Sequence, residues 1–161
     1  LCEAGCSMRR SPPAGLRTAG RTGAGSPLGR RAVSCSAMAW ARAPAATRSF
    51  VILMDDQAGR AGLGVNHWVA YGIAPRANGL PEGAAVAAPT GFSAGKNSLG
   101  VPYLGPCPPR GNAPQHYVYT LIATSLEAGA LPPGLDKAAV LEALKGGKAL
   151  GAASLVLRFH H

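Results

Sequence analysis

Short apolar runs separated by glycine and proline constrain the fold of this chain most. Three runs are clear, at residues 49–54, 67–73 and 117–123, and they are rich in β-branched and aromatic side chains. Their length and their polar or proline boundaries predict buried strands rather than helices. The stretch 74–115 is rich in Gly, Pro, Asn and Ala and is predicted to be mostly loop. The 22 Gly and 14 Pro of the whole chain favour many turns over a helix bundle.

The C-terminal part carries the clearest helix signal. Asp136 is placed as an N-cap or a first-turn acid, apolar residues recur at helical spacing over 137–145, and Gly146 and Gly147 end the pattern. Residues 153–159 then alternate as a final strand. Because strands and helices do not alternate as βαβ units, we expect a mainly β fold rather than a doubly wound parallel sheet.

The first residues differ in composition from the rest. Residues 1–49 hold eight Arg, no Lys and one acid, so most of the net charge of +9 lies there. We predict a disordered Arg/Gly/Pro-rich arm over 1–34 and one domain over 35–161. The charge lies in an arm without interleaved aromatic residues, which argues against specific nucleic-acid binding and leaves only weak nonspecific adhesion.

The four cysteines, at positions 2, 6, 35 and 107, show no zinc-type spacing with histidine. We therefore predict no metal site and no cofactor, and interpret the cysteines as free thiols in a reducing compartment. No window approaches the roughly 20 apolar residues of a transmembrane helix, and no apolar core of a secretory signal is visible. A cytoplasmic protein is expected, or a periplasmic one if a signal peptide has been lost.

Four segments follow one another in the chain: SFVILMDD at 49–56, HWVAYGI with LPEG at 67–83, GPCPP with QHYVY at 105–119, and the helix end with the final strand at 141–159. Together they resemble the phosphatidylethanolamine-binding protein family, and specifically its bacterial Raf-kinase-inhibitor-like branch. Residues 49–56 (SFVILMDD) are similar to the family strand that runs into an Asp-Pro-Asp-x-Pro loop. Residues 67–73 (HWVAYGI) and 80–83 (LPEG) resemble its His-Trp-Val-x-Tyr-Asn-Ile strand and Leu-Pro-Glu-Gly turn. The most specific piece is Gly-Pro-Cys-Pro-Pro at 105–109, followed by QHYVY at 115–119. The helix end at 141–146 and the final strand are similar to the close of the family domain.

The resemblance covers about residues 40–160. It implies a β-sandwich-like fold of two antiparallel sheets with peripheral helices and a C-terminal helix and strand. It also implies a small pocket for phosphate-like anions, including phospholipid head groups, and a regulatory role toward a kinase or protease. The candidate ligand-binding residues at the pocket positions are Asp56, His67, Gly105, Pro106, Gln115 and Tyr117.

The resemblance weakens toward the N-terminus, where the family's first strand is not found. The Arg-rich arm would then replace that strand in the domain over 35–161. Two interpretations stay open, an authentic arm and a wrong start or reading frame in the gene model.

An anion pocket needs hydrogen-bond donors that converge, and a neighbouring carboxylate can accept from a head-group ammonium or from an imidazole. Asp56 closes one strand and His67 opens the next, so the two side chains can meet at one edge. Strand alternation puts Gln115 and Tyr117 on one face and His116 on the other. Gln115 stands where the family has its second pocket histidine, and an amide cannot become cationic, so dianion binding should weaken.

Each of these residues also has a purely structural interpretation. Asp56 can cap a turn, His67 can bond to backbone within a strand, and Tyr117 can pack in the core. Gly105 and Pro106 are interpreted as a rigid wall, and Cys107 as a small buried filler.

The loop after Asp56 departs from the family pattern because Gln57, Ala58 and Arg60 replace Pro, Asp and Pro. A non-proline cis bond costs about 2.5–4 kcal/mol, so we expect the bond at Gln57 to be trans. Arg60 is expected to be exposed, with an inward orientation that would replace the missing histidine charge as the alternative.

The sequence therefore predicts a non-enzymatic binding module. One alternative is a degenerate family member without a working pocket. The other is a hydrolase that uses Asp56 and His67 as acid and base. No nucleophile elbow, metal-ligand set or glycine-rich phosphate loop supports catalysis, so no catalytic residue is assigned.

Overall fold

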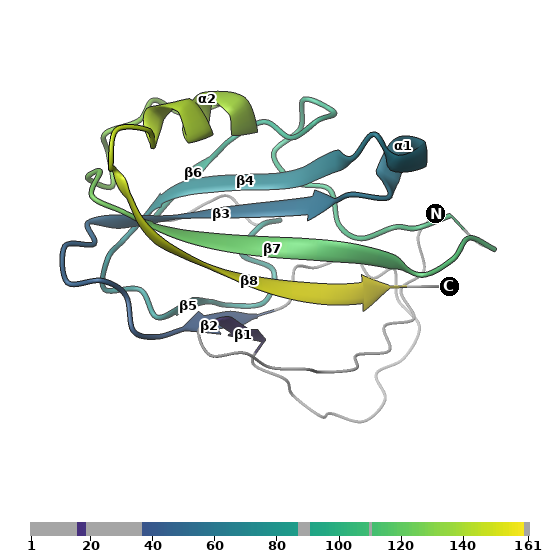
Figure 1. The fold of residues 1–161 in the computed structure, drawn as a ribbon, viewed down its shortest axis with the longest axis horizontal. Helices are drawn as coiled ribbons and strands as arrows, with labels where there is room; N and C mark the ends of the chain where they lie inside the picture. The colour runs from purple at the N-terminus through teal and green to yellow at the C-terminus, as the bar shows by residue number, and fades with distance from the viewer. Residues whose placement is uncertain (1–15, 19–36, 87–90, 110, 160–161) are drawn as a thin grey trace.

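The computed structural model describes residues 16–18, 37–86, 91–109 and 111–159. Its strands form two antiparallel sheets (Figure 1). The small sheet has the order β1 (Leu16–Thr18), β2 (Met38–Trp40), β5 (Gly79–Leu80). The large sheet has the order β6 (Ser93–Ala94), β4 (Val65–Ile73), β3 (Ser49–Asp56), β7 (Gln115–Thr124), β8 (Ala149–Phe159). The predicted two-sheet β-sandwich is confirmed.

The three apolar runs form the central strands β3, β4 and β7, and each strand is two or three residues longer than its run. The added residues are polar or lie at the strand ends, and they continue the backbone ladder. Asp56, for example, pairs with Val65 on one side and Tyr117 on the other. The ladder therefore extends past the hydrophobic signal and carries the chemically interesting residues at its end.

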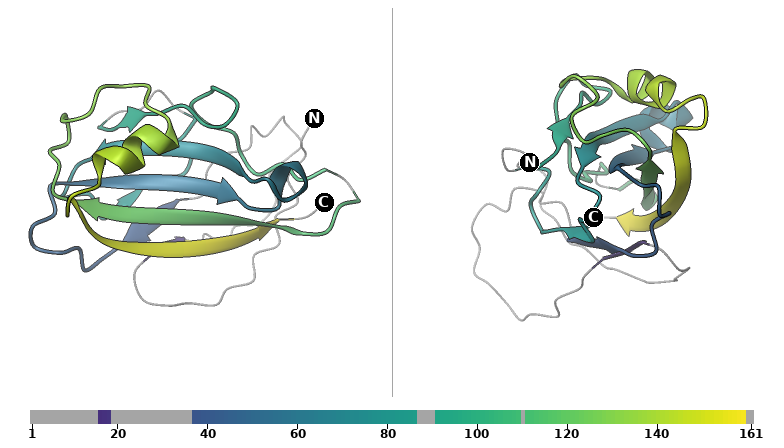
Figure 2. Two further views of the ribbon diagram at one scale, coloured as in Figure 1. Left: turned by 45° about the horizontal axis from the view of Figure 1, so that its top comes forward. Right: turned by 90° about the vertical axis from the view of Figure 1, so that its left-hand side faces the viewer.

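Side chains of β3 point alternately into two apolar clusters. Phe50, Ile52 and Met54 pack with Trp40 of the small sheet. On the other face, Val51 and Leu53 pack with residues of α2 (Lys137–Ala143) and the residue after it. Figure 2 shows the resulting layers, with α2 over one face of the large sheet and the small sheet across the other. Every residue of β3 is buried because both faces are covered.

The two helices differ in kind. In α2, the Asp136 side chain accepts a hydrogen bond from the Ala139 amide at 2.8 Å, so the predicted N-cap is confirmed. The other helix, α1 (Gly59–Gly62), is one turn at the end of β3, within a stretch predicted as loop. Arg60 and Ala61 there have φ of 52° and 57°, so this element is a tight left-handed turn rather than a regular helix. No helix among the described residues is long and apolar enough to cross a membrane.

The predicted arm over 1–34 falls mostly outside the described residues. Within it only Leu16–Thr18 are described, and they form β1, which pairs with β2. A short strand of this segment therefore joins the small sheet of the domain.

The prediction that the cysteines are free thiols was wrong for Cys107. Cys107 is disulfide-bonded, and it is half-buried rather than a buried filler. Spacing along the chain could not reveal this, because a disulfide requires two Cα atoms about 4.4–6.8 Å apart and only tertiary structure sets that distance.

Candidate functional site

Asp56, His67 and Tyr117 lie near one end of the large sheet, on three neighbouring strands. Asp56 is the last residue of β3, and Tyr117 lies directly opposite it on β7. Directly opposed residues of an antiparallel pair share a face, and Tyr117 belongs to the apolar cluster that faces the small sheet. All three side chains are buried, with exposed fractions of 2% for Asp56, 6% for His67 and 1% for Tyr117.

His67 reaches this face through a β-bulge. The β3–β4 ladder pairs Met54 with Trp68 but Asp55 with Asn66, so β4 has one extra residue and His67 lacks a partner on β3. Regular alternation would put His67 and Trp68 on opposite faces. Instead the His67 ring meets the Tyr117 ring edge to face, with centroids 5.1 Å apart and planes at 80°. The bulge therefore brings the imidazole to the face that carries Asp56 and Tyr117.

The His67 ring is oriented by the segment before Cys107. Its Nδ1 lies 3.0 Å from the Leu104 carbonyl oxygen. A carbonyl can only accept, so Nδ1 carries the hydrogen and, in the neutral ring, Nε2 carries the lone pair. Burial lowers the pKa of His67 below its ordinary value of 6.5, although the Leu104 hydrogen bond and the negative charges of Asp56 and Asp55 act in the opposite direction.

Asp56 also caps the turn that follows it. Its Oδ1 accepts a hydrogen bond from the Ala58 amide at 3.0 Å, as the structural interpretation of this aspartate expected. The turn closes tightly against β4, since a Cβ added at Gly59 would lie 2.7 Å from a Val65 methyl. All peptide bonds among the described residues are trans, including that of Gln57, and Arg60 is exposed.

The Asp55 side chain points to the opposite face of the sheet. Its Oδ1 accepts from Lys137 Nζ at 2.8 Å, beside a groove of about 600 Å³ under α2. The sequence left Asp55 and Asp56 as equally good turn acids. The structure separates them, because adjacent residues of a strand point to opposite faces.

The Tyr117 hydroxyl is held between two groups. It accepts a hydrogen bond from the Cys107 amide at 3.3 Å and donates to Gln115 Oε1 at 3.3 Å. Burial raises the pKa of Tyr117 to about 12, so the hydroxyl keeps its proton. Because the Gln115 oxygen faces Tyr117, its NH₂ group is left to donate elsewhere. His116, between them, is exposed, as strand alternation predicts.

Gly105 and Pro106 are buried within a segment fixed at both ends. Leu104 exchanges two hydrogen bonds with His67: its carbonyl accepts from the ring Nδ1, and its amide donates to the His67 carbonyl at 3.0 Å. Cys107 bonds to the Tyr117 hydroxyl. The segment therefore spans from β4 to β7 beside the three side chains.

Sequence reasoning missed two asparagines that support His67. Asn66 Nδ2 donates to the Met54 and Trp68 carbonyls, both at 3.2 Å, and to Asp55 Oδ1 at 3.1 Å, which ties the bulge together. Asn97 Nδ2 donates to the His67 carbonyl at 3.1 Å. Both side chains are buried. Their role depends on the bulge, which hydrophobic periodicity does not reveal.

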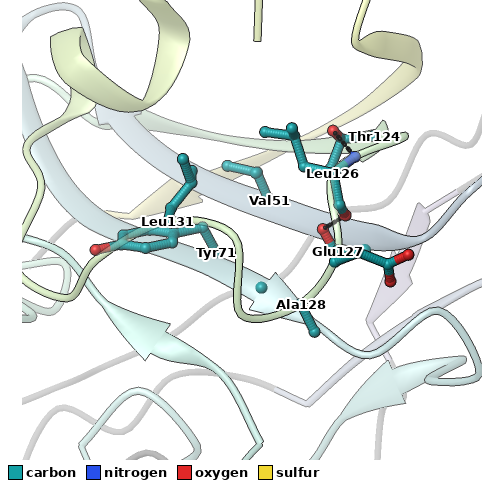
Figure 3. A pocket seen from close by; sticks show the side chains of 9 residues that line it. Val51, Tyr71, Thr124, Leu126, Glu127, Ala128 and Leu131 are labelled. Atoms are coloured by element: carbon teal, nitrogen blue, oxygen red, sulfur yellow. Dashed lines mark hydrogen bonds between the residues drawn. The ribbon is translucent and has the colours of Figure 1, made fainter. Parts of the chain in front are cut away.

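A separate small cavity lies behind β3 and β4, beside the 124–131 connection. Figure 3 shows Tyr71, Thr124, Leu126 and Leu131 around it. Its volume of about 10 Å³ holds one water molecule at most, so it cannot accept a ligand.

Known proteins are similar to this chain in sequence and in fold. A sequence model of the family described as phosphatidylethanolamine-binding protein matches residues 12–160. A UPF0098 protein of Aquifex aeolicus is 38% identical over 119 residues, which is 73% of this chain and 68% of that protein. The UPF0098 protein PH1269 of Pyrococcus horikoshii is 36% identical over 112 residues, or 65% of this chain and 56% of that protein. The chain thus spans between about half and two thirds of the length of these relatives.

The fold comparison agrees with the sequence comparison. The crystal structure of Escherichia coli YbcL, described as a new member of the mammalian PEBP family, superposes with a TM-score of 0.69 at 25% identity. The match covers 80% of this chain and 81% of YbcL. Because the family match spans most of the chain and the two-sheet fold agrees with it, the chain belongs to the phosphatidylethanolamine-binding protein family.

Proposed function

We propose that this protein is a non-enzymatic binding module that captures a phosphate-like anion, such as a phospholipid head group, beside Asp56, His67 and Tyr117. The observation that carries the proposal is the β-bulge, which turns His67 out of register onto the face of the other two residues. Bulges recur next to functional sites, where they re-aim a side chain. A regulatory role toward a kinase or protease remains a further proposal, and it rests on the family resemblance.

The side chains of the candidate site suit a head group that carries a negative phosphate and a positive ammonium group. The Gln115 NH₂ can donate to a phosphate oxygen, and protonated His67 can donate through Nε2. The Asp56 carboxylate can accept from an ammonium group. Gly105 and Pro106 supply a wall between β4 and β7.

The same groups predict that binding depends on pH. Neutral His67 presents a lone pair at Nε2 and cannot donate to an anion, whereas the imidazolium can. Because the pKa of His67 is lowered in the free protein, its imidazole becomes mostly protonated only at a pH below 6.5. Anion affinity should therefore rise as the pH falls through this range, and binding should take up a proton.

The test is an NMR titration of the histidine ring resonances with inorganic phosphate and with phosphoethanolamine at pH 5.5 and pH 8. We expect saturable shifts of His67 that are larger at pH 5.5. His116 is the matched control, because it lies on β7 next to Tyr117 but is exposed. His67→Ala should remove the shifting resonance, which assigns it to His67, and His116→Ala should keep its response.

Two outcomes would reject the proposal. If His67 does not respond to either anion, the pocket is degenerate. If a phosphate ester is hydrolysed by the protein and this turnover disappears in His67→Ala, the hydrolase alternative is correct.

The Cys107 disulfide is relevant to whether the protein is located in the cytoplasm or in the periplasm. Stable disulfides persist in oxidising compartments and are rare in the cytosol. It therefore supports the periplasmic alternative over the cytoplasmic one.

A further inference from the structure

A groove lies on the inner face of the large sheet, far from His67. It is bordered by the loop after β2 and by β3, β7 and β8, and it has a volume of about 360 Å³. Phe50, one of its residues, is six residues from Asp56 along β3, which corresponds to about 20 Å. The groove is therefore separate from the candidate anion site.

Small side chains on β8 create this groove. Gly151 and Ala153 lie opposite Ala123 and Leu121, so they face the apolar cluster between the sheets. Later residues of β8 on the same face are large and fill that cluster: Leu155, Leu157 and Phe159. At Gly151 the nearest group to an added Cβ is Pro44 Cγ, at 3.6 Å. A Cβ added at Gly151 would therefore be in ordinary contact with the loop, without a clash.

A buried donor without an acceptor borders the groove. Trp40 lines it and is only 6% exposed, yet no hydrogen-bond partner was found for its indole Nε1 among the described residues. Buried indole N–H groups usually find a partner. An oxygen atom supplied by a ligand would provide the missing acceptor.

The groove is also lined by a cationic side chain. Arg42 lines the groove and is exposed, and none of the ion pairs of the described residues involves it. Its φ of 61° is left-handed, which is uncommon for a residue with a side chain and is often found where function requires it. The loop between β2 and β3 is held in a turn after Arg42, because the Thr47 amide and hydroxyl both donate to the Pro44 carbonyl, at 3.0 Å and 2.7 Å.

We propose that this groove binds an anionic amphiphile, a molecule with one apolar chain and a terminal acidic group. The chain packs against Phe50, Leu121 and Ala153. The head group pairs with Arg42 and accepts a hydrogen bond from Trp40. The volume lies near the lower end of the roughly 300–1,000 Å³ of small-molecule sites, which fits a single chain. This site is independent of the function proposed for Asp56 and His67.

The test follows the indole N–H resonances of the full chain by ¹⁵N NMR, with the Trp40 signal identified by its loss in Trp40→Phe. The probe is decanoate below its micelle concentration. Acetate supplies the anion alone, and decanol supplies the chain alone. We expect decanoate to shift the Trp40 signal downfield and saturably, acetate to leave it unchanged and decanol to bind more weakly.

Two substitutions locate the binding. Arg42→Gly removes the charge and suits the positive φ, so it should weaken decanoate binding about tenfold, the effect of losing one charge-assisted contact. Gly151→Leu should fill the groove and abolish the response, while Gly151→Ala, whose Cβ makes only an ordinary contact, should retain it. Both Arg42→Gly and Gly151→Leu should leave the phosphate response of His67 intact, which also reports that they fold.

Three results would overturn the proposal. They are a Trp40 signal that does not respond to decanoate, an equal response to acetate, or a decanoate response that survives in folded Gly151→Leu. The last result would mean that the amphiphile binds at another site.

Discussion

At the scale of single residues, Gln115 and His67 set the chemistry of the candidate site. The family resemblance predicts a histidine at the position of Gln115, and the amide oxygen of Gln115 accepts a hydrogen bond from the Tyr117 hydroxyl. His67 is therefore the only imidazole among the candidate ligand residues. Its lowered pKa means that the free site is neutral at this position near neutral pH.

Restoring the second imidazole should strengthen anion binding. We expect Gln115→His to raise phosphate affinity several-fold at pH 5.5, where both rings can be protonated, and to change it little at pH 8. Isothermal titration calorimetry at the two pH values measures this. Gln115→Asn, which keeps an uncharged amide, is the control, and an equal gain at pH 8 would contradict the role of imidazole charge.

Burial of His67 should also make the free energy of unfolding depend on pH. Its folded pKa lies below the unfolded value of about 6.5, so the unfolded state binds the proton more readily. The contribution of His67 to the free energy of unfolding is therefore fully present above pH 6.5. It declines as the pH falls through 6.5 toward the folded pKa. Urea unfolding between pH 5 and pH 8 should show a smaller decline in His67→Gln than in the wild type. The same decline in both proteins would exclude His67 as its source.

At the scale of elements, the bulge in β4 is the feature that connects fold and site. Asn66 holds it through three hydrogen bonds, and Asn97 bonds to the backbone of His67 itself. The 104–107 segment then fixes the imidazole and the Tyr117 hydroxyl from the side. The strands form the framework of the site, and these side-chain hydrogen bonds stabilise the bulged register of β4 at His67.

Removing the Asn66 amide should destabilise this element. Asn66→Ala leaves two carbonyls without this donor, and we expect a loss of about 1–3 kcal/mol in the free energy of unfolding. The His67 response to phosphate should weaken as well, since the bulge loses its ties. Asn112→Ala, at an exposed position, is the control. A loss below about 0.5 kcal/mol, the level of ordinary surface substitutions, would show that the bulge does not need Asn66.

At the scale of the whole molecule, a layered core of two apolar clusters supports a site at one end of the large sheet and a groove toward the other. The disulfide of Cys107 adds a covalent tie next to the candidate site. Because Cys107 donates its amide to Tyr117, the tie reaches the site through one hydrogen bond.

Reduction of this disulfide should lower stability. Disulfides typically contribute about 2–4 kcal/mol, in part by restricting the unfolded chain. We expect the thermal midpoint to fall when a reducing agent is added to the wild type, and to be unaffected by it in Cys107→Ala. Alkylation and mass spectrometry should find Cys107 blocked until reduction. A reactive Cys107 thiol in the untreated protein would contradict the bond.

Much of the fold could be predicted from the sequence, because it depends on local signals. The apolar runs identified β3, β4 and β7, and Asp136 with the following periodicity identified α2. Two-residue strands such as β5 and β6 left no such signal, since they form only where a neighbour offers backbone groups.

The sequence by itself determined the strand-rich fold, the family, and the residue types available for an anion site. Periodicity and ordered motifs carry that information, because side-chain burial alternates along each strand. Only the tertiary structure decided that β4 bulges at His67, that Asp55 and Asp56 serve opposite faces, and that Cys107 is not a free thiol. Each of these depends on register or on the distance between residues far apart in the chain, and neither is encoded in a local pattern.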